Sequence, residues 1–369
     1  MKRALIALLC LITLATAVPA QAQARPRLLP VRGADVSSLA KSEALGGVYR
    51  HADGRRGDAL RILSQAGLNY IRLKVWVRPA DGYNTKTQVL AVARRAKAAG
   101  LRLLVDFHYS DTWADPGKQF KPAAWAALPL DQLARAVHDH TFDVLDALRR
   151  QGTTADMVQV GNEINGGLLW PDGSNQNWSN TALLLNAGYD AVKRVSSRTK
   201  VVLHLANGGD NGLYRWWFDN AAAHGIRHDV IGLSYYPYWH GTLEAFQANI
   251  NDVATRYGKP VAVVETGYPF TTADDDGWEN LILAPEPYPG YQATPQGQAE
   301  LLRKVAEIVS AVPDDLGLGL FTWEATWTGV PGNGWDPADP STGNAWENQA
   351  LFDFDDRALP AMRALGHAS

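Results

Sequence analysis

The sequence predicts an α/β protein folded as a single (β/α)8 TIM barrel with enlarged loops after its strands. Short apolar runs alternate along the chain with stretches of helical period, a pattern typical of a parallel sheet with crossover helices. Eight such runs occur, at residues 31–34, 70–73, 101–107, 157–160, 201–205, 230–234, 261–265 and 319–323. Eight strand and helix pairs in a chain of 369 residues fit a barrel with extra loop length.

The stretches between these runs have the pattern of amphipathic helices that end at glycines. In residues 87–99, for example, Val89, Val92 and Ala96 fall on one face. Glycines stand where such helices should stop before the next strand, at Gly67, Gly100, Gly152, Gly225 and Gly258. An open doubly wound sheet is the structural alternative, but it usually has a glycine-rich phosphate loop after its first strand, which this sequence lacks.

The composition, with 46% hydrophobic and 20% charged residues, is that of a soluble globular domain. The formal net charge is −3, and acidic and basic residues are mixed along the chain, which argues against nucleic acid as a partner. No repeat or Pro/Ser-rich linker divides the sequence, so residues 25–369 are expected to form one barrel domain. No exposed apolar helix is evident, and a monomer is the expected state.

The N-terminus resembles a secretory signal peptide. A positive start at Lys2 and Arg3 precedes an apolar run over residues 4–17 and small residues suited to cleavage, so we assign residues 1–24 as the signal peptide. A membrane anchor is the alternative, but the run is shorter than the roughly 20 residues that span a bilayer. We therefore expect a secreted or periplasmic protein with no membrane contact after cleavage. Cys10, the only cysteine, would be removed, so the mature protein would form no disulfide.

Two glutamates follow apolar strands on the side of the barrel where active sites lie. Glu163 follows the fourth run, and Glu265 ends the seventh. Side chains from these two strands face each other across a barrel mouth. Retaining cleavage of a glycosidic bond needs two carboxyls about 5–5.5 Å apart, one as acid/base and one as nucleophile. A structural ion pair would explain either glutamate alone, but two glutamates at these positions favour catalysis.

The chain resembles clan A of the glycoside hydrolases through Asn162 and Glu163 on the fourth strand and Glu265 on the seventh. Within the clan, six motifs are similar to those of glycoside hydrolase family 53, the arabinogalactan endo-β-1,4-galactanases. They are RGADVS at 32–37, RLKVW at 72–76, DFHYSDTWADP at 106–116, GNE at 161–163, SYYP at 234–237 and ETGYP at 265–269. The resemblance extends from about residue 30 to NQALFD at 348–353.

This resemblance implies that Glu163 is the acid/base and Glu265 the nucleophile. It also implies that the substrate is the β-1,4-galactan backbone of type I arabinogalactan. Another clan A enzyme, such as a β-mannanase, xylanase or cellulase, is the closest alternative. A polysaccharide-binding protein without catalysis is an alternative from a different class.

Polar residues at other strand ends are candidates for binding the sugar: Asp35, Arg72, His108, Asn162, His204, Asn207 and Tyr235. Asn162 can hydrogen-bond the sugar 2-hydroxyl at the cleavage site. Arg72 can hold Glu265 ionised, which would lower the pKa of Glu265 and leave that of Glu163 raised. As single residues the others are more often structural, and the family motifs favour His108 and Tyr235 as sugar ligands.

Aromatic residues are frequent, with 13 Trp and 13 Tyr. Several tryptophans lie in or beside post-strand segments, where a flat ring can stack on the C–H face of a sugar: Trp76, Trp113, Trp239, Trp323 and Trp327. Packing is the alternative, and it is favoured for Trp216 and Trp217 on a predicted helix. Trp323 resembles the clan's platform under the cleaved sugar, and a strained or cis bond to Glu324 would suit that role.

The segment after the seventh strand has oxygen ligands at a spacing that suits Ca²⁺. Asp274, Asp276 and Asn280 stand at alternate positions around Trp278, and Ca²⁺ takes six to eight oxygen ligands. A solvated acidic turn explains the same spacing. The family resemblance implies a structural calcium in this loop in some bacterial members. Trp278 stands where a His is common, so only its backbone carbonyl could bind the metal.

No cofactor is expected for catalysis. The sequence has no His/Cys cluster that suggests zinc and no Gly-x-Ser-x-Gly elbow. The patterns of metallohydrolases and serine hydrolases are therefore missing.

Overall fold

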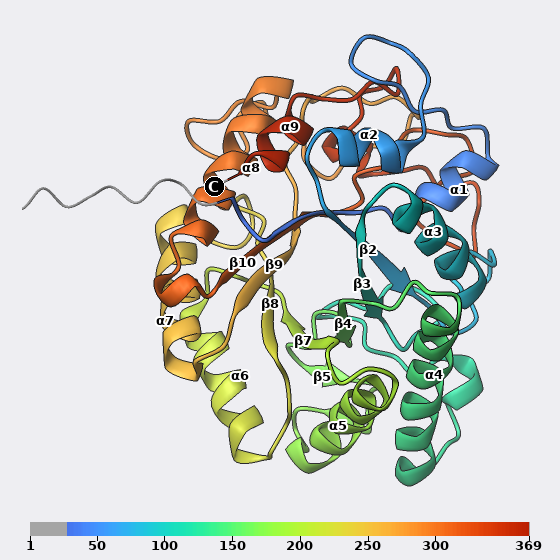
Figure 1. Ribbon diagram of the computed structural model, residues 1–369, viewed down its shortest axis with the longest axis vertical. Coiled ribbons are helices and arrows are strands. Elements are labelled where there is room, and N and C mark those ends of the chain that lie inside the picture. The colour runs from blue at the N-terminus through green and yellow to red at the C-terminus, as the bar shows by residue number, and fades with distance from the viewer. Residues whose placement is uncertain (1–27, 369) are drawn as a thin grey trace, which may run out of the picture.

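A computed structural model describes residues 28–368, and these residues form the predicted barrel. Eight parallel strands close on themselves in the order β1-β10-β9-β8-β7-β4-β3-β2 (Figure 1). They are β1 (Val31–Asp35), β2 (Tyr70–Val75), β3 (Arg102–Phe107), β4 (Met157–Val160), β7 (Lys200–Leu205), β8 (Val230–Ser234), β9 (Val261–Thr266) and β10 (Gly317–Thr322). The observed strand ends differ from the predicted ones by at most two residues. The predicted signal peptide and Cys10 lie outside the described residues.

Helices connect the strands and surround the barrel (Figure 1). They are α1 (Leu39–Ala44), α2 (Ala59–Gln65), α3 (Lys86–Ala98), α4 (Leu130–Arg150), α5 (Trp178–Val195), α6 (Asn211–Ala223), α7 (Leu243–Tyr257), α8 (Pro295–Ser310) and α9 (Ala361–Gly366). A short hairpin of β5 (Gly167–Leu168) and β6 (Gly173–Ser174) lies between β4 and α5. The apolar faces of the helices pack against the strands, as the periodicity of α3 predicts.

The inside of the barrel is filled by side chains that alternate along the strands. One apolar layer consists of Val31, Tyr70, Leu104, Met157, Val202, Val230, Ala262, Val264 and Phe321. The Phe321 ring occupies the space beside Gly33, where an added Cβ would lie 2.2 Å from the ring. On β2, β3, β4 and β7, the side chains two residues further towards the carboxyl ends form the next layer, and these are polar: Arg72, Asp106, Gln159 and His204. The apolar layer therefore closes the barrel beneath the polar one.

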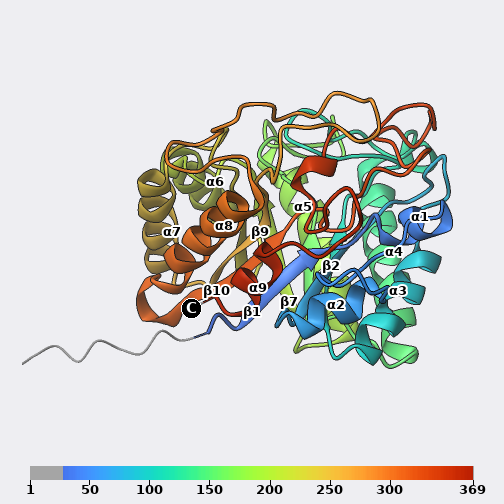
Figure 2. The same cartoon turned by 90° about the horizontal axis from the view of Figure 1, so that it is seen from above.

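The long segments after β3, β9 and β10 gather on one side of the barrel (Figure 2). This is the side where the strands end, so the enlarged loops lie where the sequence places them. The two ends of the described chain also meet, since Leu29 N donates to Ala368 O at 3.0 Å. Within residues 28–368, no helix has the length and apolar character needed to cross a membrane.

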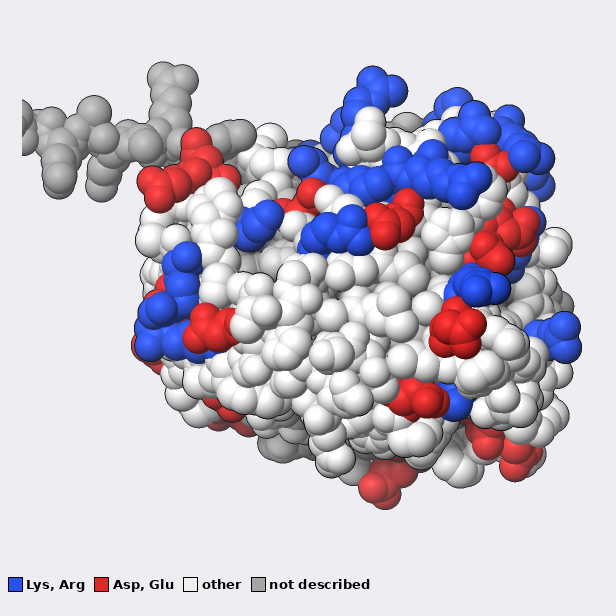
Figure 3. Space-filling view, turned by 90° about the horizontal axis from the view of Figure 1, so that it is seen from below, with Lys and Arg blue, Asp and Glu red and all other residues white. Residues whose placement is uncertain are grey.

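Charged side chains are less evenly distributed in the fold than along the sequence. Lysines and arginines gather along one edge of the molecule in Figure 3. Both α4 and α5 have basic residues in their last turns, where cations interact favourably with the helix dipole. Aspartates offset part of this charge, since Asp146 pairs with Arg149 at 2.6 Å and Arg150 at 2.7 Å.

Candidate active site

A buried polar layer lies at the carboxyl ends of five neighbouring strands. Its side chains alternate with outward-facing ones, so each reaches the barrel interior from its own strand: Arg72 (β2), Asp106 (β3), Gln159 (β4), His204 (β7) and Ser234 (β8). All five side chains are fully buried. Because buried polar groups need partners, these residues bond to one another and to the two glutamates above them.

Arg72 is the cation at the centre of this layer. Its guanidinium donates to the carboxylates of Asp35 at 2.6 Å, Asp106 at 2.8 Å and Glu265 at 2.7 Å. It also donates to Gln159 Oε1 at 2.7 Å and Asn162 Oδ1 at 2.9 Å. One buried cation therefore serves three carboxylates, and its fork of donors fixes the directions of five side chains.

Glu265 reaches the barrel mouth because β9 contains a bulge. Leu233 of β8 pairs with Val263, but the next residue, Ser234, pairs with Glu265, so Val264 is an extra residue in β9. The register against β10 shifts at the same place. Val264 points into the apolar layer, and simple alternation would turn Glu265 outward. The bulge re-aims the Glu265 carboxyl towards the other glutamate.

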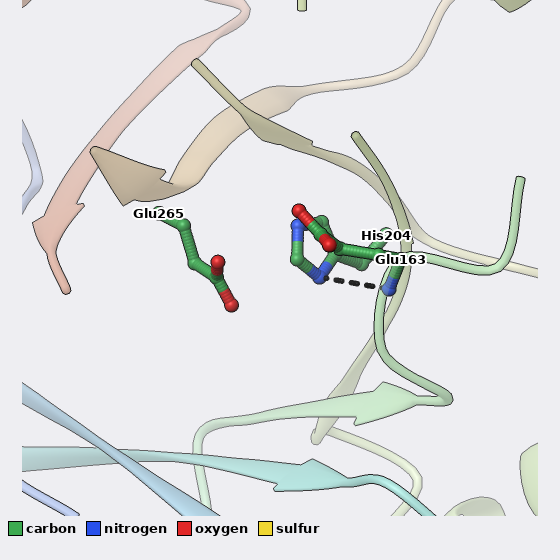
Figure 4. A group of neighbouring side chains, drawn as sticks. All are labelled: Glu163, His204 and Glu265. Atoms are coloured by element: carbon green, nitrogen blue, oxygen red, sulfur yellow. Dashed lines mark hydrogen bonds between the residues drawn. The ribbon is translucent and has the colours of Figure 1, made fainter. Parts of the chain in front are cut away.

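Glu163 lies across the mouth from Glu265, in the turn that follows β4. Its backbone has a φ of 47°, in the left-handed region that non-glycine residues rarely adopt. Figure 4 shows the two carboxyls with His204 beside Glu163. One oxygen from each carboxyl and one His204 nitrogen all lie within 4.8 Å of one another. An approach this close suits a retaining hydrolase, whose two carboxyl groups lie about 5–5.5 Å apart.

Burial raises the pKa of both glutamates. The pKa of Glu163 rises to about 7, although the hydrogen bond with Ser234 lowers the pKa and so offsets part of the effect of burial. The pKa of Glu265 also lies well above its ordinary value, because burial outweighs the contact with Arg72. The prediction that Arg72 holds the pKa of Glu265 below its ordinary value is therefore wrong. Two carboxyls this close repel each other when both are ionised, so they tend to share a proton.

The cleft above the glutamates is lined mainly by aromatic rings. Its walls are formed by His108, Trp113, Ala114, Asp115, Pro116, Asn162, Ala206, Asn207, Tyr236, Trp239, His240, Leu281, Trp323, Trp335 and Trp346. Trp323 meets Trp346 edge to face, with ring centroids 4.7 Å apart. Trp113 stacks on Trp335 at 5.0 Å. Such rings offer flat apolar faces beside polar groups, which is the chemistry of a sugar-binding cleft.

Of the predicted substrate-binding residues, His108, Asn162, Asn207 and Trp323 line this cleft. Asp35, Arg72 and His204 are fully buried beneath it. The last three hold other side chains in place and do not line the cleft. Among the predicted tryptophans, Trp113 and Trp239 also line the cleft, while Trp76 and Trp327 are buried behind it.

The prediction that Tyr235 faces the sugar is wrong. Its ring is buried against Phe246, with centroids 4.0 Å apart, and its hydroxyl donates to Gly241 O at 2.9 Å. Tyr236, the next residue, lines the cleft, and its hydroxyl lies 3.4 Å from Glu265 Oε2. Alternation along β8 explains the difference, because Ser234 and Tyr236 share the inner face. Neither Ser234 nor Tyr236 was among the residues predicted from the sequence.

The bond between Trp323 and Glu324, which the sequence suggests is strained or cis, is not cis, but the backbone of Glu324 is in a strained conformation. The only cis peptide bond within residues 28–368 is Trp170–Pro171. The chain turns after β10 through Glu324 itself, which has a φ of 47°. The Glu324 carboxylate pairs with Lys74 and accepts from Ser38 N at 3.0 Å, so this turn is held by a buried ion pair.

The acidic loop after β9 meets a glutamate from the segment after β10. Asp274 and Asp276 each place a carboxylate oxygen within 4.8 Å of Glu347 and of each other. Glu347 Oε2 and Asn280 Oδ1 are buried and have no hydrogen-bond partner among the described residues. These unpaired oxygens fit a hard cation such as Ca²⁺. Trp278 contributes no ligand from its side chain, which is 46% exposed.

Glu347 is the site residue that the sequence could not supply, because it lies far along the chain from Asp274. Burial and the neighbouring aspartates raise the pKa of Glu347 to about 7. A bound cation would relieve this repulsion. The cluster therefore has the charge and the free oxygens of a cation site that would join the loops after β9 and β10.

Comparison with known proteins agrees with this geometry. The model of glycosyl hydrolase family 53 matches residues 31–365. The chain is 36% identical to the endo-beta-1,4-galactanase of Bacillus subtilis, covering 92% of this chain and 86% of that protein. It is 38% identical to the arabinogalactan endo-beta-1,4-galactanase of Thermothelomyces thermophilus, covering 81% and 90%. The solved GH53 catalytic domain of Ignisphaera aggregans superposes with a TM-score of 0.88 at 40% identity, covering 95% and 98%. The chain therefore belongs to glycosyl hydrolase family 53.

Proposed function

We propose that this protein is a secreted endo-β-1,4-galactanase that cleaves the backbone of type I arabinogalactan with retention of configuration. The observation that carries the proposal is the approach of Glu163 and Glu265 across the barrel mouth, where one oxygen of each carboxyl lies within 4.8 Å of the other. The aromatic cleft above them suits a polysaccharide. Relatives named as galactanases support the choice of galactan as the substrate.

The mechanism is a double displacement. Glu163 protonates the departing galactosyl oxygen while Glu265 attacks the anomeric carbon, and Glu163 then activates water to release the sugar. The proton that the two carboxyls share rests on Glu163, because Arg72 donates directly to Glu265 at 2.7 Å. Asn162 donates one Nδ2 proton to Ala114 O at 2.8 Å and keeps the other for the sugar 2-hydroxyl.

Replacing each glutamate by glutamine tests these roles. Glu163→Gln and Glu265→Gln should each lose several orders of magnitude in kcat on galactan while keeping the melting temperature of the parent. An aryl β-1,4-galactobioside with a good leaving group separates the two variants. The first step on this substrate needs little acid catalysis because the leaving group is good. Glu163→Gln should therefore still release one equivalent of phenol rapidly, whereas Glu265→Gln should not. Near-parental activity in either variant would remove that residue from the mechanism.

Product analysis tests the substrate. Linear β-1,4-galactan should yield mixed oligosaccharides early in the reaction, as internal cleavage requires, and the first-formed products should keep the β-anomer. Mannan, xylan and cellulose serve as comparison substrates, since a β-mannanase, xylanase or cellulase would prefer one of them. Binding to galactan without release of reducing ends would instead identify a non-catalytic binding protein.

The calcium site is a further part of the proposal. Asp274, Asp276, Asn280 and Glu347 would hold a structural Ca²⁺, with the carbonyl of Trp278 as an additional ligand, and the ion would take no part in catalysis. Unpaired oxygens on Asn280 and Glu347 support it. We expect the melting temperature to rise with added CaCl₂ and to fall with a chelator. An unchanged melting temperature would favour a solvated acidic turn.

Export and assembly can be tested on the full-length chain. We expect cleavage after about residue 24, a monomer in solution, and no binding to nucleic acid or membranes. N-terminal sequencing of protein from the culture medium or periplasm checks the cleavage. Light scattering coupled to size exclusion checks the monomer.

A further inference from the structure

The hydroxyl of Ser234 lies between the two glutamates and contacts both. Ser234 ends β8 and is fully buried. Its Oγ lies 2.5 Å from Glu163 Oε1 and 3.3 Å from Glu265 Oε2. His204 Nε2 lies 2.8 Å from the same oxygen. The single hydroxyl proton can serve either carboxyl, but only one at a time.

A chain of hydrogen bonds leads from Arg72 to Ser234, and each donor in it points towards Ser234. Arg72 Nε donates to Gln159 Oε1 at 2.7 Å, which turns the Gln159 amide group towards His204 Nδ1 at 2.9 Å. The backbone N–H of Glu163 points at the same nitrogen at 3.4 Å, as the dashed line in Figure 4 shows. Because two donors face Nδ1, the His204 ring carries its proton on Nε2 and donates it to Ser234.

Burial and charge keep His204 in this state. Burial and the nearby Arg72 hold the pKa of His204 well below its ordinary value, so the ring is neutral and has one proton to place. Asn162 Oδ1 also lies 2.9 Å from His204 Nδ1. That oxygen already accepts from Arg72 Nη2 at 2.9 Å, so it does not need a proton on Nδ1. His204 therefore supplies the hydrogen bond that holds the Ser234 oxygen in place.

We propose that Ser234 is a positioning residue whose hydroxyl proton follows the negative charge between Glu265 and Glu163 during the reaction. This inference rests on the proposed double displacement. Before attack, Glu265 is the carboxylate and Glu163 carries a proton, so Ser234 donates to Glu265 and accepts from Glu163. Once Glu265 is esterified to the sugar, Glu163 becomes the carboxylate after giving its proton to the leaving group. Ser234 then donates to Glu163.

A serine hydroxyl is suited to this exchange because it needs only a rotation about the Cβ–Oγ bond. The oxygen stays where His204 holds it, and no bond between heavy atoms forms or breaks. A backbone N–H at the same place would point at one carboxyl permanently. The hydroxyl instead stabilises whichever carboxyl is charged, and so serves both halves of the reaction.

The test compares Ser234→Ala with Ser234→Thr, which keeps a hydroxyl. Ser42→Ala is the matched control, because Ser42 is fully buried in α1 and its hydroxyl bonds to Thr326 O at 3.3 Å and to Asn333 Nδ2 at 2.8 Å. We expect Ser234→Ala to lower kcat on galactan about 10- to 100-fold, the worth of a hydrogen bond to a charged group, with little change in KM. Ser234→Thr should recover much of this loss, and Ser42→Ala should keep parental kcat.

Two further readouts separate positioning from a structural effect. With the aryl galactobioside, release of the sugar from Glu265 limits the rate, and Ser234→Ala should slow this step as well. The alkaline limb of kcat/KM should move to higher pH in Ser234→Ala, because the Glu163 carboxylate loses a donor while Arg72, Asp106, Asp115 and Glu265 around it are unchanged. Neither readout should change in Ser42→Ala.

The outcomes distinguish this inference from the proposed function. If the parent hydrolyses galactan and both glutamine variants are inactive, but Ser234→Ala keeps both rates within about twofold and the same alkaline limb, the role of Ser234 is overturned alone. A slowed first step with an unchanged second step would also overturn it. If the parent hydrolyses no galactan, the proposed function itself fails.

Discussion

Arg72 is the residue whose replacement should disturb this site most. The structure gives it five acceptors within 2.9 Å, three of them carboxylates, and no exposure to water. Arg72→Lys keeps the positive charge but offers three donors from one point, so at least two acceptors lose their partner. Each lost hydrogen bond to a charged partner costs about 1.5–3 kcal/mol, or about 3–6 kcal/mol for two.

This cost can be measured as a change in the free energy of unfolding. The entropy of unfolding is about 2.1 cal/mol/K per residue, so a loss of about 3–6 kcal/mol corresponds to a fall in Tm of about 4–8 °C for a domain of this size. Thermal unfolding followed by circular dichroism measures the shift. Arg72→Met, which leaves three buried carboxylates without a cation, should be less stable still.

Arg227→Lys is the matched control for the arginine fork. Arg227 also makes two hydrogen bonds to a carboxylate, at 2.7 and 2.8 Å to Asp190, but its side chain is 46% exposed. Exposed pairs contribute about 0–1 kcal/mol, so its Tm should hardly change. If Arg72→Lys unfolds at the temperature of the parent, or if Arg227→Lys loses as much stability, the reasoning from buried charge is refuted.

Three further perturbations address the acid, the platform and the cation site. In the proposed mechanism the protonated form of Glu163 is the acid, and the pKa of Glu163 is about 7. The value of kcat/KM on galactan should therefore fall as the pH rises through about 7, and a limb above pH 9 would assign the acid to another group. Trp323→Ala should lower kcat/KM by about 2- to 10-fold through lost stacking, measured against Trp216→Ala on the far surface of α6, and equal effects would remove Trp323 from the sugar site. Folding raises the pKa of Glu347 from about 4.5 to about 7. Without a cation, the protonated form of Glu347 therefore favours the folded state, and this contribution to stability is lost as the pH rises from about 4.5 to 7. The gain in Tm from CaCl₂ should therefore be larger at pH 8 than at pH 5 and should disappear in Glu347→Gln, and a gain independent of pH would exclude Glu347 as a ligand.

The fold and the two glutamates were predictable from local patterns. Buried parallel strands read as apolar runs, and a barrel places the residues after each run on one face. The positions of Glu163 and Glu265 at the ends of the fourth and seventh strands were therefore enough to predict that both lie at the barrel mouth. The direction in which each side chain faces was not predictable, because it depends on register. The bulge at Val264 is set by pairing with β8 and β10, and nothing in the apolar run of β9 marks it.

The choice of Tyr235 as a sugar ligand could have been corrected by the alternation of side chains along β8, if the inner face of that strand had been known. Ser234 and Tyr236 lie on that face, and Tyr235 lies between them on the outer one. The motif of residues 234–237 gives no sign of which tyrosine faces in. Glu347 could not be found from spacing at all, because its contact with Asp274 and Asp276 joins two separate loops. Spacing along the sequence can identify only those ligands that lie within one segment.

The two glutamates differ chiefly in how each is connected to Arg72. Glu265 accepts directly from the guanidinium, so a full positive charge faces the carboxyl that acts as the nucleophile in the proposed mechanism. Glu163 has no direct hydrogen bond from Arg72. A chain of hydrogen bonds between neutral side chains connects the two, in the order Gln159, His204 and Ser234. Neutral hydrogen bonds stabilise a carboxylate less than a cation does, so Glu163 can gain and lose a proton within one turnover. The bulge in β9 creates this asymmetry, because without it Glu265 would turn away from Arg72 and would lose its direct hydrogen bond from the cation.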